Sequence, residues 1–401
     1  MYHDRFKQVG FLDIAAHENV GWFCNAYNST LLRMNMRTGE VELEAFLPSL
    51  SVTGKLQYGS IIYVDGDLVI TPYNAQEIVI YNIASKHILK IALNQQEKQK
   101  RIGTLFISAI VYDKSVYFFP GRYPAIVKLD LQTYEITYFS EWYDEVKNYI
   151  KNEKSVVCNA RPICINDYCL FPCYQIDWLI KFSFHDGKYD ICKLSDECNH
   201  ILCLQYDGDD LWIAYADKPL ILRYSLRTGS KRIYDQLPID AEIKLGFTFI
   251  YPYKDKILAI PLIGDIFLVY DKITGESSKY LDFKIPLMAE AGKEGLAVTG
   301  YNFICYKVIH ENEILLYSTF ENQILQIDLE KQEVRKSEGI LRQKEDINQI
   351  KDKYFEREEV LYESDVSSLP YYLHHIGDRK KDMISDANNN MGEEIWRYLG
   401  K

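Results

Sequence analysis

The 401-residue sequence contains no run of about 18 apolar residues, so it predicts no membrane-spanning helix. The segment from Met1 to Lys7 has no apolar stretch, and we therefore expect no secretory signal peptide. Acidic residues outnumber basic ones by 57 to 46, which gives a net charge of −11. Because nucleic-acid phosphates require a basic protein surface, this balance disfavours a nucleic-acid partner.

The short motifs of common catalytic and metal sites are also missing. The sequence contains no G-x-S-x-G, H-E-x-x-H, P-loop or G-x-G-x-x-G segment. Its nine cysteines include no C-x₂-C pair, the spacing that zinc knuckles use. The sequence therefore predicts no metal site and no cofactor, and it leaves open whether the protein is an enzyme.

Seven of the nine cysteines lie between Cys158 and Cys203. An odd number of cysteines, without the spacing of a small disulfide scaffold, indicates free thiols and a cytoplasmic location. Free cysteine packs as a small apolar residue, so core packing is the main interpretation of this cluster. Metal binding and redox chemistry are the alternatives.

Aromatic residues are abundant: the sequence has 32 Tyr, 18 Phe and 5 Trp. Such residues favour half-buried strands, and a repeated strand pattern is present. Seven apolar segments each end in a small polar residue, at spacings of 47, 48, 53, 42, 46 and 57 residues. These polar positions are Asn35, Asn82, Asp130, Ser183, Ser225, Asp271 and Asp328.

A turn follows each polar position at a fixed offset. In four repeats a glycine stands four residues later, where it supplies the positive φ that a short hairpin needs; these are Gly39, Gly187, Gly229 and Gly275. The other three repeats use Ser85-Lys86, Thr133-Tyr134 and Lys331-Gln332. Two further apolar strands precede each polar position, and the nearer one often ends in proline, as in Val69–Pro72. Each repeat therefore predicts four strands.

A four-stranded unit repeated seven times resembles the β-propeller superfamily, in which ring closure limits exposed strand edges. The resemblance covers residues 8–340 and implies an all-β, seven-bladed β-propeller. The kelch Gly-Gly doublet and the WD40 Trp-Asp dipeptide are both missing. The resemblance therefore implies a scaffold but no inherited active site.

Residues 341–401 form the second predicted part of the chain, a helical C-terminal extension. Ile347, Ile350 and Tyr354 have helical spacing among charged residues. Further helix starts are predicted at 367–370 and after 388–390. This extension either packs on the flank of the ring or docks a partner. A helix is also expected at 141–154, between the third and fourth repeats.

In a propeller, the loops between the second and third strands gather on one face with the connections between blades. Loops on a rigid scaffold commonly carry function. Four of these loops contain tyrosine, a residue that suits recognition surfaces. The predicted ligand-binding residues are Tyr27, Asn28, Tyr73, Asn74, Arg122, Tyr123, Tyr174 and Asp177. The alternative is that these aromatic residues only brace the loops.

The innermost strands begin at the mouth of the central channel, where a second candidate site lies. Arg161 can pair with an anionic ligand or with an internal carboxylate. His200 can act in acid–base chemistry or satisfy a loop carbonyl. The candidate lining residues are Tyr58, Ser60, Asn159, Arg161, His200, Thr248 and Asn302.

Two classes of function follow from these surfaces. The first is a scaffold that recognises a protein, peptide or glycan partner through its tyrosine-rich loops, with no nucleic-acid or membrane partner. The second is a lyase or hydrolase with Arg161 and His200 as catalytic candidates at the channel mouth. Propellers of the streptogramin-lyase type carry such chemistry, although no motif here matches theirs. The lack of catalytic motifs favours recognition.

Overall fold

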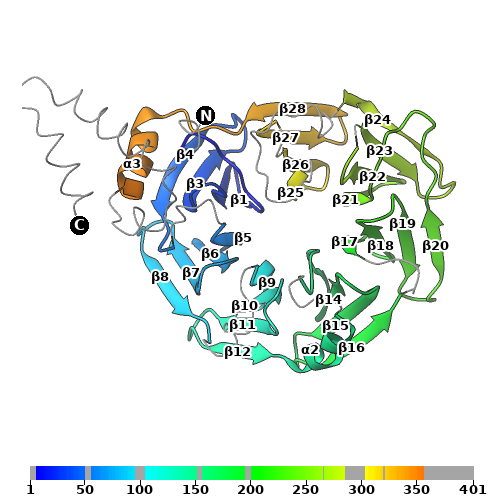
Figure 1. Ribbon diagram of the computed structural model, residues 1–401, viewed down its shortest axis with the longest axis horizontal. Helices are drawn as coiled ribbons and strands as arrows, with labels where there is room; N and C mark the ends of the chain where they lie inside the picture. The colour runs from blue at the N-terminus through cyan, green and yellow to red at the C-terminus, as the bar shows by residue number, and fades with distance from the viewer. Residues whose placement is uncertain are drawn as a thin grey trace, which may run out of the picture.

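Seven four-stranded antiparallel sheets, the blades, are arranged in a ring in the computed structural model (Figure 1). The structure describes residues 6–49, 56–94, 104–150, 156–194, 200–264, 266–284, 303–318 and 321–355. Within these residues each blade consists of four consecutive strands paired in sequence order. The predicted seven-bladed β-propeller is therefore confirmed.

The strands are named by their place in the blade, from the channel outward. The innermost strands are β1 (Ala15–His17), β5 (Tyr58–Val64), β9 (Phe106–Tyr112), β13 (Ile163–Ile165), β17 (Ile201–Tyr206), β21 (Phe247–Tyr253) and β25 (Phe303–His310). The second strands are β2 (Val20–Cys24), β6 (Asp67–Pro72), β10 (Ser115–Pro120), β14 (Tyr168–Cys173), β18 (Asp210–Tyr215), β22 (Lys256–Pro261) and β26 (Glu313–Ser318). The third strands are β3 (Thr30–Asn35), β7 (Glu77–Asn82), β11 (Ile126–Asp130), β15 (Trp178–Ser183), β19 (Ile221–Ser225), β23 (Ile266–Asp271) and β27 (Gln323–Asp328). The outermost strands are β4 (Val41–Phe46), β8 (Ile88–Ala92), β12 (Ile136–Phe139), β16 (Tyr189–Lys193), β20 (Lys231–Tyr234), β24 (Ser277–Lys284) and β28 (Glu333–Glu338).

Apolar side chains of the second and third strands fill the spaces between neighbouring blades. Val69 of β6, for example, shares one buried cluster with Phe118 of β10 and Val127 of β11. The second strands are almost wholly buried, as in β10, where all six residues are buried. Sheets that pack on both faces require such continuous apolar strands. The core is therefore distributed around the ring, between the blades.

Each third strand ends at the polar residue that the repeat pattern predicts. Where this residue is Asn or Asp, and also at Ser225, its side chain accepts hydrogen bonds from the turn that follows, as Asp271 does from Ile273 N at 2.9 Å and Thr274 N at 2.8 Å. This contact is an Asx-turn, which Asn and Asp form readily. These hydrogen bonds lower the pKa of Asp271, the bond from Thr274 having the largest effect. The recurring residue is therefore a turn cap.

Four residues after the cap, the backbone has positive φ in every repeat. Gly229 has φ of 71° and Gly275 has 86°. The repeats without glycine have the same conformation, at Lys86, Tyr134 and Gln332, with φ of 60°, 60° and 55°. The turn geometry is thus common to all seven blades, and glycine is its least strained occupant.

The two ends of the described chain meet and close the ring. Gln8 forms an isolated antiparallel bridge with Ile340. Val9 N donates to Gly339 O at 2.8 Å, and Leu341 N donates to Lys7 O at 2.7 Å. The innermost strand of the first blade, β1, begins shortly after this closure, at Ala15.

Helix α3 (Lys344–Phe355) continues from this closure and lies beside the first blade (Figure 1). Ile347 and Ile350 are buried in one cluster with Phe6 and Leu341. Asp346 Oδ2 accepts a hydrogen bond from Leu43 N of β4 at 2.9 Å. The helix therefore packs on the flank of the ring. The division of the chain at residue 340 remains a prediction, and the later predicted helix starts lie outside the described residues.

The insertion predicted at 141–154 forms α2 (Glu141–Val146) and the short 3₁₀ helix η1 (Lys147–Tyr149). Trp142 and Val146 are buried against the fourth blade, and their spacing of four residues places them on one face of the helix. The helix is shorter than expected, and residues 151–155 lie outside the described part.

Candidate functional site

Three side chains from sequence-distant loops meet at the mouth of the ring. Tyr174 follows β14, His200 precedes β17, and Asp217 follows β18. The rings of Tyr174 and His200 are 4.8 Å apart between centroids. His200 Nδ1 lies 3.9 Å from Asp217 Oδ2. We call these three residues the rim patch.

Backbone hydrogen bonds hold the rim patch together. His200 N donates to Tyr174 O at 2.8 Å, and His200 O accepts from Ala216 N at 2.9 Å. His200 has φ of 63°, a left-handed conformation that costs free energy in a residue other than glycine. The fourth and fifth blades are thereby joined through the backbone of His200. Its imidazole faces the carboxylate of Asp217 and is 42% exposed.

An apolar cluster lies under the rim patch. Leu202, Ala216 and Leu262 are buried in it, and Tyr174 and Ile263 pack against it while partly buried. The patch therefore combines an apolar floor with an exposed imidazole and an exposed carboxylate. Surfaces of this mixed character suit interfaces, in which apolar centres are surrounded by polar rims.

Arg161, the second catalytic candidate, is paired inside the ring. Its Nη2 lies 2.9 Å from Asp13 Oδ1 and donates to Leu12 O at 3.1 Å. Its guanidinium also lies 5.2 Å from the centre of the Tyr306 ring. The sequence left open whether Arg161 pairs with an anionic ligand or with an internal carboxylate. In the structure it pairs with an internal carboxylate, that of Asp13.

Asp13 is the residue that the sequence interpretation missed. It is 3% exposed and accepts hydrogen bonds from Ser60 Oγ at 2.6 Å and Ile14 N at 2.9 Å. Lys307 Nζ lies 3.5 Å from the same carboxylate. Burial alone would raise the pKa of Asp13, but Arg161, Lys307 and the hydrogen bonds outweigh it and lower the pKa below its ordinary value. No sequence signal marks Asp13, because its partners come from three other blades.

Three of the predicted ligand-binding residues are buried, so the expectation that they are exposed at the rim is wrong. Tyr123 is 0% exposed, and its ring packs 4.8 Å from that of Phe106. Asp177 is 2% exposed and accepts a hydrogen bond from Tyr215 Oη at 3.1 Å. Asn28 is 5% exposed, and its side chain caps the following turn. Asn28 Oδ1 and Asp177 Oδ1 thus accept hydrogen bonds from the protein itself, as buried polar atoms commonly do.

The other predicted loop residues are partly exposed. Tyr27, Tyr73 and Arg122 are half-buried, as is Tyr174 of the rim patch. Asn74 is half-buried and braces its loop, since its Nδ2 donates to Leu56 O at 2.5 Å and its Oδ1 accepts from Thr104 N. Arg122 and Tyr174 therefore share no exposed surface with Tyr123, which faces the core. Of the other predicted mouth residues, Tyr58, Ser60 and Thr248 are buried, and Asn302 lies outside the described residues.

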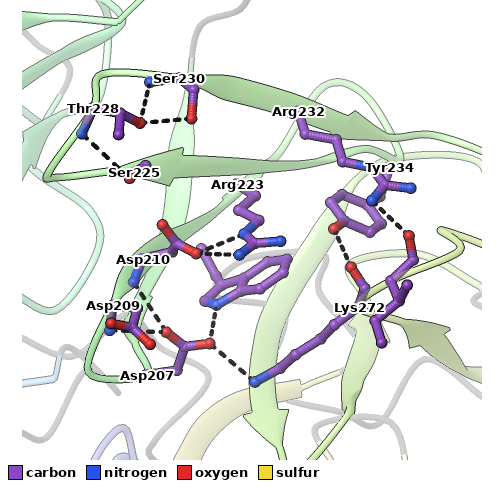
Figure 2. Close-up of polar contacts among 12 residues, drawn as sticks. Asp207, Asp209, Asp210, Arg223, Ser225, Thr228, Ser230, Arg232, Tyr234 and Lys272 are labelled. Carbon is purple, nitrogen blue, oxygen red and sulfur yellow. Dashed lines mark hydrogen bonds and ion pairs between the residues drawn. The ribbon is translucent and has the colours of Figure 1, made fainter.

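A groove of about 840 Å³ lies on the opposite face, between the hairpins of the fourth and fifth blades. No motif in the sequence predicted it. Polar residues of its lining take part in internal contacts, as Figure 2 shows: Arg223 Nε donates to Asp210 Oδ2 at 2.6 Å, and Thr228 Oγ1 donates to Ser230 Oγ at 2.8 Å. Its lining includes Asn166, Tyr168, Tyr206, Asp209, Arg227 and Lys231. Its exposed residues serve below as control positions for substitutions in the rim patch.

Comparisons with known proteins agree with this architecture. A structure of catalytically inactive virginiamycin B lyase from Staphylococcus aureus with quinupristin is similar, with a TM-score of 0.54 and 10% identity over 79% of this chain and 94% of that one. A chain of the mitotic checkpoint complex gives a TM-score of 0.53 and 11% identity, over 80% and 89% of the two chains. Hsv2 from Kluyveromyces lactis gives 0.51 and 8%, over 83% and 99%. These likenesses show the fold.

No family model and no curated protein matches the sequence. The sheet topology and the structural likenesses nevertheless define the chain as a seven-bladed β-propeller. In the part that the structure describes, no group of His, Cys, Asp and Glu residues is arranged to hold a metal ion. The described helices include none that is long and apolar enough to cross a membrane.

Proposed function

We propose that this propeller is a recognition scaffold that binds a protein or peptide partner at the rim patch. The observation that carries the proposal is the convergence of Tyr174, His200 and Asp217 from three loops into one exposed, backbone-clamped surface. Binding energy concentrates in a few aromatic and charged anchors on rigid surfaces. Tyr174 and the apolar floor supply such an anchor, and Asp217 favours a cationic side chain of the partner.

Two further observations support recognition. Arg161 is paired with Asp13, so its guanidinium is already engaged in an internal contact and is not free for anion chemistry. One of the similar propellers belongs to a multi-protein assembly, the mitotic checkpoint complex.

The eight described cysteines are all free thiols, which supports the cytoplasmic location that the sequence predicts.

The proposal is tested with a photo-crosslinking amino acid at position 218, an exposed neighbour that leaves Asp217 in place, which captures the partner from an extract of the source organism. The partner is then purified and titrated against the unmodified protein and the Tyr174→Ala, Asp217→Ala double variant. We expect affinity to fall at least tenfold. The free energy of unfolding should change by less than about 1 kcal/mol, because Asp217 is exposed and Tyr174 is half-buried.

The matched control is the Asp209→Ala, Arg227→Ala double variant, whose residues are exposed on the opposite face. It should bind the partner as tightly as the unmodified protein. Equal affinity of all three proteins would exclude the rim patch as the interface.

A lyase or hydrolase at the same mouth is the second candidate function. The specific observation in its favour is the 3.9 Å approach of Asp217 to His200, an arrangement that can orient an imidazole as a base. Two results together would favour catalysis over recognition. The purified protein would show enzymatic turnover that the His200→Gln variant lacks, and the crosslinking experiment would capture no partner.

A further inference from the structure

Cys164 and Cys169 lie directly opposite each other in the hairpin formed by β13 and β14. The strand register pairs Cys164 with Cys169 and, one step nearer the turn, Ile165 with Tyr168. Residues that are directly opposite in an antiparallel pair project from the same face of the sheet. The two thiols therefore share one face of the fourth blade.

The length of the turn determines how close the two cysteines are. Only Asn166 and Asp167 join the strands, so Ile165 and Tyr168 are the pair that closes the turn. In a two-residue hairpin the closing pair exchanges both backbone hydrogen bonds, and the next pair outward is not hydrogen-bonded. The Cα atoms of such a pair are about 4.5 Å apart, which lies within the range of roughly 4.4–6.8 Å that disulfides require.

The two thiols differ in their access to solvent. Cys164 is exposed, whereas Cys169 is 0% exposed. Of the other cysteines that the structure describes, Cys192 is half-buried and the rest are buried. A dissolved oxidant therefore reaches Cys164 directly, and it reaches Cys169 only through Cys164.

We infer that Cys164 and Cys169 are a redox-active dithiol, which oxidised glutathione converts into a cross-strand disulfide. The Cys164 thiolate attacks one sulfur of oxidised glutathione, and the other sulfur leaves as glutathione thiolate. The Cys169 thiolate then attacks Cys164 Sγ and displaces the second glutathione. Two protein thiols are oxidised, the small disulfide is reduced to two thiols, and the two thiol protons pass to the departing thiolates.

Two neighbouring thiols could compete for Cys169. Cys158 and Cys173 belong to the same buried cluster as Cys169. Cys158 Sγ already donates to Ala160 O at 3.4 Å, and both thiols are fully or nearly fully buried. The register places neither of them opposite Cys169 in a strand pair, so Cys164 is the favoured partner.

The experiment uses the full-length protein and oxidised glutathione at about pH 8.5. Although Cys164 is exposed, partial desolvation of its thiol raises the pKa to about 11, and burial raises the pKa of the Cys169 thiol well above its ordinary value, so both reactive thiolates are scarce at neutral pH. Remaining thiols are blocked with N-ethylmaleimide, disulfides are then reduced, and the released thiols receive a second label. After digestion, mass spectrometry locates each label. We expect the second label on both Cys164 and Cys169, in at least a tenfold excess over Cys158 and Cys173.

Three variants separate the steps. Cys169→Ala should retain glutathione on Cys164, because the displacing thiol is gone. Cys164→Ser should leave Cys169 in its thiol form, and Cys192→Ser is the matched control that should form the disulfide as the unmodified protein does. A stable glutathione adduct on Cys164 in the unmodified protein, or a second label on Cys169 with Cys158 or Cys173 instead of Cys164, would overturn the inference.

Discussion

Asp13 is a buried charge inside the ring, and its surroundings explain why a carboxylate is tolerated there. Arg161 and Lys307 approach it from the fourth and seventh blades, and Ser60 donates to it from the second. A buried charge is costly unless it is paired and hydrogen-bonded. Asp13 meets both conditions, and its contacts join four blades across the centre of the ring.

Asp13→Asn should therefore lower the free energy of unfolding by about 2–3 kcal/mol near pH 7, where the carboxylate is charged. The loss should be smaller than for a fully buried pair, because Arg161 and Lys307 are 26% and 29% exposed and stay partly hydrated. Urea unfolding measures the difference. Asp209→Asn, an exposed site, is the control and should change stability by less than about 0.5 kcal/mol.

The same variant has a defined pH dependence. The pKa of Asp13 is lower in the folded protein than the value of about 3.9 in an unfolded chain. The ionised carboxylate therefore contributes stability above about pH 4, and this contribution is lost as the pH falls through the lower folded-state pKa. The stability difference between the unmodified protein and Asp13→Asn should shrink when unfolding is repeated near pH 3. A constant difference would show that Asp13 does not titrate as inferred.

At the scale of the elements, the turn between the third and fourth strands is the most regular feature of the blades. A side-chain cap begins it, and a residue with positive φ closes it, at Gly229 in the fifth blade and at Gln332 in the seventh. A left-handed conformation costs roughly 1–2 kcal/mol in most L-residues and little in glycine.

Gln332→Gly should therefore stabilise the protein by about 0.5–1 kcal/mol, whereas Gly229→Ala should destabilise it by about 1 kcal/mol. A Cβ at Gly229 meets no atom within 4 Å, so only the backbone conformation is penalised there. Thermal unfolding followed by circular dichroism measures both changes. Gln332→Ala, which keeps the strained φ, is the control and should be nearly neutral; equal stability of Gln332→Gly and Gln332→Ala would contradict the argument.

At the scale of the whole molecule, the ring depends on contacts between residues more than 300 positions apart. The segments at 7–9 and 339–341 pair through an isolated bridge, and helix α3 buries Ile347 and Ile350 in the cluster that holds Phe6. Gly339 is a point of close approach, because a Cβ there would lie 2.9 Å from Val9 O and 3.0 Å from Asn322 O. Closure is therefore least strained when the residue at this position has no side chain.

Gly339→Ala should lower the free energy of unfolding by about 1–3 kcal/mol, since backbone atoms must shift to admit the methyl group. Amide hydrogen exchange should also accelerate at Val9 and Leu341, whose N–H groups close the ring. Glu338→Ala, an exposed change beside it, should have an effect below about 0.5 kcal/mol. Unchanged exchange at Val9 and Leu341 would indicate that closure does not depend on this contact.

The sequence alone determined the repeat, because its signals are local. The cap at Asp271 and the turn residue Gly275 lie four positions apart, and each acts on its own backbone. Strand alternation and apolar second strands are likewise properties of short windows. Seven such windows at a mean spacing near 49 residues determine the number of blades and predict the ring.

Only the tertiary structure decided which side chains meet. Asp13 and Arg161 are 148 positions apart in the sequence, and neither carries a local signal for the other. Tyr123 and Tyr174 occupy equivalent loops, yet one is buried against Phe106 and the other lies at the rim. The side-chain environment of a loop depends on the neighbouring blade, which sequence periodicity cannot specify. The rim patch, the internal ion pair and the groove therefore came from packing, whereas the blades came from local backbone chemistry.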